Sequence, residues 1–482
     1  MSLKAQVISG LKWSALSKLI AQLFSWVSTF LVIRLLTPED YGLIAIVSVF
    51  FIFITIFTVN GFVTTLVRTQ KLENAVCNQL FTLSISLYIF ISLTISYFAP
   101  DIAAFYNNQQ IENVIYAMAL ITPLNSFCII PNAYLNIEMN FKAKAICESI
   151  AAFISAIVAL YFAYSGHGYW ALFYSLAAEL IVRTVLLNVV NKHRYALDRR
   201  LNALKEVLSF SYKIQLNELI WFSYNKLDTL IVGKFLGIQQ LGIYNVGVEI
   251  ASLPMTKASA ILNQVGFSAF SKVNNDRSAG HYYLERSIKL VSLFIFPVFL
   301  GISAVSYELV WLFLGDKWID AAAIISIFAF LFPLRMINAI IYNFVISINQ
   351  PNFAIKNTLI ICVLVISSIL VGVQFGLLTT AISWLTGFCL AFLIILVRAK
   401  MILKINYQIL FSWLSPFCIS LLMWLIIFGF DFYFSEKIET LGMLAAKISI
   451  GSLLIIILYA AFYKSEIISI VSRKQSNKDA SE

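Results

Sequence analysis

Three cations of this 482-residue sequence lie well inside long apolar stretches, where a charge is costly and needs a reason. Lys213 falls in the run 207–233, Lys257 in 241–269 and Arg335 in 319–348. Lysine and arginine without matching carboxylates attract an anionic ligand, and they bind phosphate through charge-assisted hydrogen bonds. We therefore interpret these cations as candidate contacts for a phosphate or pyrophosphate group.

Polar and aromatic side chains join these cations on two helical faces. Placed at 100° per residue, six polar residues of the run 11–36 fall within about 120°: Ser14, Lys18, Gln22, Ser25, Ser28 and Thr29. Five residues of 207–233 fall within about 80°, with Glu218 and Asn225 beside them: Lys213, Asn217, Trp221, Tyr224 and Asp228. The candidate substrate-binding residues are Lys18, Gln22, Lys213, Asn217, Trp221, Tyr224, Lys257 and Arg335. The alternative is that these side chains only pack helices together, with Lys18 reaching the membrane surface.

Carboxylates in the same stretches are candidates for ion coupling. Glu218, Asp228 and Glu249 could bind a proton or a sodium ion. They could equally serve as counter-ions for Lys213 and Lys257. Both interpretations stay open from the sequence.

The composition requires a lipid environment around most of the chain. Hydrophobic residues make up 60% of it and charged residues only 12%, about half the usual charged fraction of soluble domains. A span of about 20 apolar residues crosses the membrane, and this template predicts an all-α protein of about fourteen transmembrane helices. The predicted spans are 11–36, 41–67, 78–99, 113–136, 143–164, 168–191, 207–233, 241–269, 287–306, 319–348, 353–375, 377–398, 408–430 and 441–463.

The distribution of charge predicts how these spans are oriented. Most of the 34 lysines and arginines fall in alternate loops and both tails, so both termini are expected in the cytoplasm. The net charge of +10 is then explained without a nucleic-acid partner. Acidic residues gather in the opposite loops: Glu39, Asp40, Asp101, Glu112, Glu308, Asp316, Asp431, Glu436 and Glu439.

The sequence offers no chemistry typical of an enzyme. It contains no nucleotide-binding glycine loop, no CxxC pair and no HExxH motif, and its six cysteines are scattered. No predicted loop is long enough for a catalytic domain. We therefore expect no catalytic residue, cofactor or metal.

A short internal repeat relates the two halves of the chain. Leu31–Gly42 resembles Leu230–Gly242, so that Arg34 matches Lys234 and Gly42 matches Gly242. Each copy closes one helix and opens the next at an outer turn, which is a candidate outer gate. Parallel repeats of this kind form the two lobes of some transporters. The predicted organisation is a first six-helix lobe (1–200), a second six-helix lobe (201–405), two additional helices (406–463) and a cytoplasmic tail (464–482).

The repeat segments also carry a family resemblance. Arg34–Ala45, Asn225–Gly237, Leu241–Tyr244 and Leu253–Pro254 together resemble the polysaccharide-transporter branch of the multidrug/oligosaccharidyl-lipid/polysaccharide exporter superfamily. Within it, the chain is similar to Wzx-type flippases of O-antigen and exopolysaccharide units, especially the colanic-acid-exporter-like group.

The resemblance implies two lobes around a central cavity in the bacterial inner membrane. The implied substrate is an undecaprenyl-pyrophosphate-linked oligosaccharide, moved from the cytoplasmic to the periplasmic leaflet by alternating access. Membrane lipids, a polysaccharide polymerase and a chain-length regulator are the other implied partners. The pyrophosphate contacts are assigned to Lys18, Lys213, Lys257 and Arg335 by location alone.

Two alternatives are weighed against this function. A drug/cation antiporter of the same superfamily has the same architecture, but a cationic cavity would repel its substrates. A membrane polysaccharide polymerase or ligase is similarly hydrophobic, but it would need a substantial periplasmic loop that this chain lacks.

Overall fold

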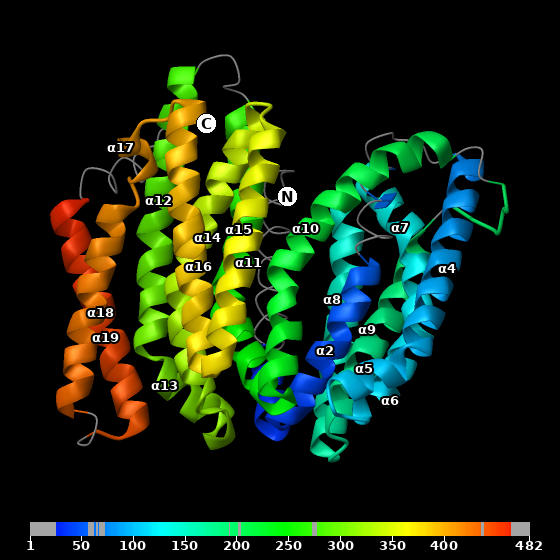
Figure 1. The fold of residues 1–482 in the computed structure, drawn as a ribbon, viewed down its shortest axis with the longest axis horizontal. Helices are drawn as coiled ribbons and strands as arrows, with labels where there is room; N and C mark the ends of the chain where they lie inside the picture. The colour runs from blue at the N-terminus through cyan, green and yellow to red at the C-terminus, as the bar shows by residue number, and fades with distance from the viewer. Residues whose placement is uncertain are drawn as a thin grey trace, which may run out of the picture. The chain divides into compact units, whose positions relative to one another are not determined.

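The computed structural model describes residues 26–55, 62–63, 66, 73–191, 193–200, 204–271, 277–434 and 438–463. For 54, 205–218, 256–271, 277–279 and 351 it describes the backbone but not the side chains. Lys18 and Gln22 therefore lie outside the described residues, as do the side chains of Lys213, Asn217, Glu218 and Lys257. The described part is helical throughout and contains no strand (Figure 1). It divides into two compact units, which are described separately below.

The first unit comprises residues up to Val246, together with Ile369–Thr380. In it, α2 packs against α6, α9 and α10, while α4 packs against α6 and α7. A 3₁₀ turn at Thr122–Asn125 (η2), which contains Pro123, separates α6 from α7. The helices are α2 (Pro38–Thr55), α4 (Asn74–Tyr97), α5 (Ala99–Phe105), α6 (Gln110–Ile121), α7 (Ser126–Ile137), α8 (Phe141–Tyr164), α9 (Tyr169–Val190), α10 (Lys205–Leu236) and the beginning of α11 (Ile238–Ser271).

The second unit comprises Gly247–Ser368 and the chain from Ala381 onward. Here α12 packs against α14 and α18, and α18 packs against α19. A π-helical turn at Val310–Leu314 (η4) follows α13 directly. The remaining helices are α12 (Arg277–Ala304), α13 (Ser306–Leu309), α14 (Ala321–Ser347), α15 (Pro351–Gly372), α16 (Leu377–Leu403), α17 (Tyr407–Leu410), α18 (Leu414–Phe434) and α19 (Thr440–Phe462).

Many of these helices are long and apolar enough to cross a membrane. Among the described residues, ten satisfy that test, and the pair Trp26–Leu35 and Pro38–Phe53, bent by 116°, adds an eleventh if counted as one span. Helices suit this environment because they satisfy every backbone hydrogen bond internally. The prediction of an all-α, multi-pass membrane protein is confirmed, while the count of fourteen stays a prediction.

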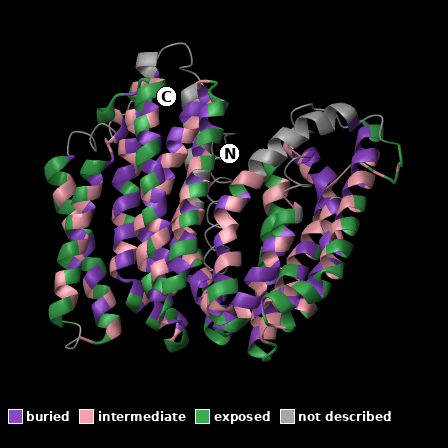
Figure 2. Ribbon diagram, viewed as in Figure 1, coloured by how far each residue is buried: buried purple, intermediate pink, exposed green. Residues whose placement is uncertain are grey.

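Burial differs sharply between helices of the second unit (Figure 2). In the apolar window of α14, 61% of the residues are buried, compared with 17% in α19. Large apolar side chains such as Phe432 and Phe462 are exposed on α18 and α19. An apolar surface of this extent fits contact with lipid rather than water.

The α8–α9 pair shows how small residues determine packing in the first unit. Every fourth residue of α8 is small and buried, so that a smooth ridge lets the two helices approach closely. The Ser155 hydroxyl contacts the Ser175 backbone oxygen at 3.0 Å and its hydroxyl at 2.8 Å. The ridge consists of Cys147, Ala151, Ser155, Ala159 and Ala163.

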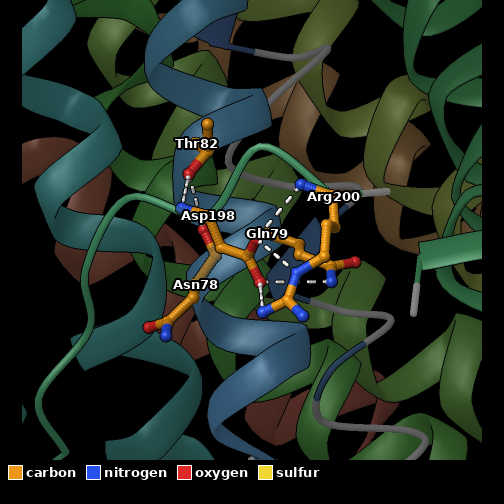
Figure 3. A network of polar contacts seen from close by, with 5 residues as sticks. All are labelled: Asn78, Gln79, Thr82, Asp198 and Arg200. Atoms are coloured by element: carbon orange, nitrogen blue, oxygen red, sulfur yellow. Dashed lines mark hydrogen bonds and ion pairs between the residues drawn. The ribbon is translucent and has the colours of Figure 1, made fainter. Parts of the chain in front are cut away.

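The segment 193–200, which follows α9, is hydrogen-bonded to the beginning of α4 (Figure 3). The amides of Ala196 and Asp198 donate to the side-chain oxygens of Asn78 and Thr82, each at 2.8 Å. Two residues of extended chain advance about 6.6 Å and four residues of helix about 6 Å. The two spacings therefore match.

Asp198 is the ionic centre of this attachment. Its carboxylate accepts from Arg200 Nε at 3.0 Å and from Arg200 Nη2 at 3.2 Å. Gln79 Nε2 also donates to it at 3.3 Å. The hydrogen bonds from Arg200, with a smaller contribution from Gln79, lower the pKa of Asp198 below its ordinary value of 3.8.

Removing this charge should release the segment from α4. In Asp198→Asn, we expect faster amide hydrogen exchange over 193–200, because the Arg200 contacts lose their charge. Because the pKa of Asp198 is lower in the folded protein than its ordinary value of 3.8, the ionised carboxylate stabilises the folded state above pH 3.8. This stabilisation is lost as the pH falls through the lowered pKa of the folded state. Asp320→Asn, which replaces an exposed carboxylate elsewhere, is the control. Unchanged exchange in Asp198→Asn would show that the charge does not hold the segment.

Candidate functional site

Residues next to one another in the sequence explain why α2 begins at Pro38. Thr37 and Asp40 cap each other, because the Thr37 amide donates to Asp40 Oδ2 at 2.9 Å and the Asp40 amide donates to Thr37 Oγ1 at 3.3 Å. This reciprocal pair is a capping box. Pro38 occupies the first helical position, where it lacks no needed donor.

The repeat-related turn before α11 is formed by a glycine instead of a capping box. Gly237 adopts φ 86° and ψ 170°, a backbone conformation that glycine permits readily. It separates α10 from α11 without any further connecting residue. Two different local devices thus begin the two repeat-related helices.

The two turns contact each other reciprocally through their glycines. A methyl group added at Gly42 would lie 2.0 Å from the Ile238 carbonyl oxygen. One added at Gly242 would lie 1.7 Å from the Pro38 carbonyl oxygen. Both distances are far below van der Waals contact, so any larger residue must separate the helix ends. We refer to Pro38–Gly42 and Ile238–Gly242 as the glycine crossing.

The two basic residues of the repeat, Arg34 and Lys234, are both exposed near the ends of their helices. Lys234 Nζ donates to the Phe105 backbone oxygen at 2.6 Å and lies 4.0 Å from the Phe105 ring centroid. Arg34 is exposed near the end of the first described helix.

The predicted polar face of α10 is partly described. Trp221 is 54% exposed, whereas Tyr224 is buried at 8%. Asp228 is also buried, and its carboxylate accepts from the Tyr244 hydroxyl at 2.8 Å and from the Thr229 amide at 2.7 Å. Asp228 is therefore held by α11 as well as by its own helix.

Arg335 of α14 lies among aromatic rings in the second unit. Its guanidinium carbon lies 5.1 Å from the Trp384 ring centroid and 5.6 Å from that of Phe332. Such positions stabilise a cation through the ring quadrupole. Glu249, on the part of α11 in this unit, is exposed.

A further intramembrane cation, Arg183 of α9, was missed by the sequence analysis. Its Nη2 lies 3.3 Å from Asn125 Oδ1, at the 3₁₀ turn that follows α6. Its Nε is buried and has no hydrogen-bond partner within the described residues. The available signal was a lone arginine inside the predicted span 168–191.

An ion triad around the buried Lys447 in the second unit was also missed. Lys447 of α19 is 1% exposed, and its Nζ lies 2.5 Å from Glu308 Oε1 and 2.9 Å from Asp431 Oδ1. It also donates to the Ala304 backbone oxygen at 3.2 Å. Glu308 and Asp431 were predicted to lie in loops, and Lys447 falls within the predicted span 441–463. The triad joins α18 and α19 to the end of α12 and to α13.

Comparison with solved structures defines the class of fold. The chain superposes on the lipid II flippase MurJ in its inward closed conformation with a TM-score of 0.76 and 15% sequence identity. The match covers 93% of this chain and 99% of that one. At this identity, the likeness establishes a common fold.

The family follows from the sequence comparison. Residues 31–323 match the family described as polysaccharide biosynthesis protein, and the chain belongs to that family. It is 24% identical over 345 residues to an uncharacterized membrane protein in the cps region of Klebsiella pneumoniae, covering 70% of each chain. It is 23% identical over 404 residues to the lipopolysaccharide biosynthesis protein WzxC of Escherichia coli, covering 81% of this chain and 79% of that one. The predicted resemblance to the polysaccharide-transporter branch is confirmed.

Adding one methyl group at the glycine crossing should open it. In Gly42→Ala or Gly242→Ala, we expect faster amide exchange over 38–46 and 238–246, because the new Cβ meets a backbone carbonyl that cannot rotate away. Gly301→Ala and Gly429→Ala are matched controls, since a methyl group there meets nothing within 4 Å. Equal exchange in all four variants would argue against a tight crossing.

Breaking the ion triad should destabilise the second unit. Lys447→Met leaves two carboxylates without their cation, and loss of one member of a buried pair costs about 3–5 kcal/mol. We expect a clear drop in the thermal unfolding midpoint of the detergent-solubilised protein. Removing the charge of Glu308 as well, in Glu308→Gln/Lys447→Met, should restore part of the loss. Lys356→Met, at an exposed site, is the control, and an equal midpoint in Lys447→Met and the control would contradict the anchoring role.

Proposed function

We propose that this protein is a flippase that moves undecaprenyl-pyrophosphate-linked oligosaccharide units from the cytoplasmic to the periplasmic leaflet. The cargo would supply the assembly of a surface polysaccharide such as O-antigen or exopolysaccharide. Membership of the polysaccharide biosynthesis family and the fold shared with a lipid II flippase both support this function. The observation that carries it furthest is the presence of arginines inside the membrane-spanning helices.

These arginines suit an anionic head group at membrane depth. Arg183 is near the middle of α9 and keeps a buried Nε without a partner among the described residues. Arg335 is near the middle of α14, with aromatic rings beside it. A pyrophosphate would accept charge-assisted hydrogen bonds from such groups. Lys18, Lys213 and Lys257 complete the proposed cationic set, with Gln22, Asn217, Trp221 and Tyr224 as further contacts.

The glycine crossing fits the outer closure that alternating access requires. Backbone contact at Gly42 and Gly242 would hold the outer ends of two repeat-related helices together. Opening it would expose the cargo to the periplasmic side, with Arg34 and Lys234 flanking the turn. Such a gate needs glycine, because the helix ends must meet closely and still separate.

The remaining parts of the proposal concern topology and energy. We place about fourteen spans in the inner membrane, with both termini cytoplasmic, and assign them to the predicted lobes 1–200 and 201–405 and the helix pair of 406–463. Asp228 is the ion-coupling candidate with defined surroundings, while Glu218 and Glu249 retain that role as predictions. A polymerase and a chain-length regulator are the proposed pathway partners.

Flipping can be measured directly in proteoliposomes. A fluorescent undecaprenyl-pyrophosphate oligosaccharide would report its leaflet through an impermeant quencher. We expect protein-dependent flipping, slowed about tenfold or more in a variant with Lys213, Lys257 and Arg335 all changed to Gln, since one charge-assisted hydrogen bond is worth about 1.5–3 kcal/mol. Arg183→Gln should slow it as well.

The controls separate charge in the spans from charge at the surface. Lys356→Gln and Lys142→Gln replace exposed cations and should flip at the wild-type rate. Normal flipping by the triple variant at equal protein levels would refute the cationic site. Absence of flipping by folded wild-type protein, with efflux of a cationic dye instead, would favour the drug/cation antiporter.

A further inference from the structure

A second site lies in the first unit, away from the intramembrane arginines. An open cavity of about 560 Å³ is lined by residues of α2, α5 and α10. Phenylalanines form much of its wall, and Phe98, Phe105 and Phe235 are 48%, 51% and 59% exposed. An aromatic, apolar cavity of this size accommodates a flexible hydrocarbon chain. In a membrane protein, exposed phenylalanine rings fit contact with lipid rather than water.

Lys234 supplies a fixed cation in the wall of this cavity. Its ammonium group is held by the Phe105 backbone oxygen at 2.6 Å and by the Phe105 ring below it at 4.0 Å. The Tyr106 hydroxyl, which donates to the Leu230 oxygen at 3.4 Å, ties the same two helices together. An ammonium carries three donors; one is used by the Phe105 oxygen and one faces the Phe105 ring, which leaves one for a ligand.

Asp101 supplies the opposite charge in the same cavity. It is exposed in the first turn of α5 and makes no hydrogen bond or ion pair in the part of the chain that the structure describes. Lys234 and Asp101 thus line one cavity without neutralising each other. The complementary ligand carries both an anion and a cation beside an apolar chain.

We propose that this cavity binds a phospholipid whose head group contains a primary ammonium, as in phosphatidylethanolamine. Lys234 donates to the phosphate, Asp101 accepts from the ammonium, and an acyl chain lies against the phenylalanines. Phosphatidylglycerol is disfavoured because it leaves Asp101 beside an anion. Phosphatidylcholine is disfavoured because its quaternary ammonium has no N–H to donate. The inference does not depend on the cargo of the protein.

Native mass spectrometry of the delipidated full-length protein tests this site. Phosphatidylethanolamine, phosphatidylcholine and phosphatidylglycerol of equal chain length would be titrated separately. We expect phosphatidylethanolamine to bind about tenfold more tightly than the other two, as one charge-assisted hydrogen bond implies. Asp101→Asn should abolish the preference over phosphatidylcholine, and Asp101→Glu should retain it. Lys234→Met should weaken all three lipids about tenfold.

Matched variants distinguish this cavity from general lipid binding. Asp316→Asn and Lys317→Met change exposed charges outside the cavity and should leave all affinities unchanged. Ile102→Trp should fill the cavity and weaken every lipid. Equal binding of phosphatidylethanolamine and phosphatidylcholine by the wild type would overturn the proposal, whatever the variants do. Stronger competition by undecaprenyl pyrophosphate than by phosphatidylethanolamine would also overturn it, in favour of a cargo site.

Discussion

A charged side chain within a lipid-embedded bundle must find its partner in the protein or in a ligand, because the hydrocarbon provides none. Lys447 contacts two carboxylates and a backbone oxygen, and these contacts join α12, α13, α18 and α19 of the second unit. Arg335 has aromatic rings beside it. Arg183 contacts Asn125, and its buried Nε has no hydrogen-bond partner among the described residues. Lys447 thus has an anchoring role, whereas anion binding by the arginines is a proposal.

The glycine crossing depends on the opposite property, the absence of a side chain. The two helices that meet there begin differently: α2 begins with the capping box of Thr37 and Asp40, and α11 follows Gly237, which has a positive φ. Both nevertheless make the same reciprocal contact through Gly42 and Gly242. The contact involves backbone carbonyls and the Ile238 side chain, so any side chain added at either glycine would separate the helix ends. In the proposed transport cycle this contact opens and closes, whereas the ion triad stays formed.

Much of the architecture could be predicted because it follows from local sequence. The apolar runs gave helices over nearly the predicted ranges, as in Phe141–Tyr164 for 143–164 and Thr440–Phe462 for 441–463. The repeat pointed to Gly42 and Gly242 before any contact between them was known. The surroundings of the candidate site residues were harder to predict. Trp221 and Tyr224 share a face on a helical wheel, yet one is exposed and the other buried, because a wheel gives a direction but not the neighbour in that direction.

The sequence by itself determined the class of protein, the helical spans and the repeated turn. The spans depend on hydrophobic run length and the turn on a short motif, both of which act within one helix or loop. The class of protein follows from the family resemblance of the repeat segments. Only the tertiary structure decided that Gly42 meets Ile238, that Lys447 meets Glu308 and Asp431, and that Lys234 and Asp101 share a cavity. These partners are far apart in the chain, and their meeting depends on how helices pack in three dimensions, which no local pattern encodes.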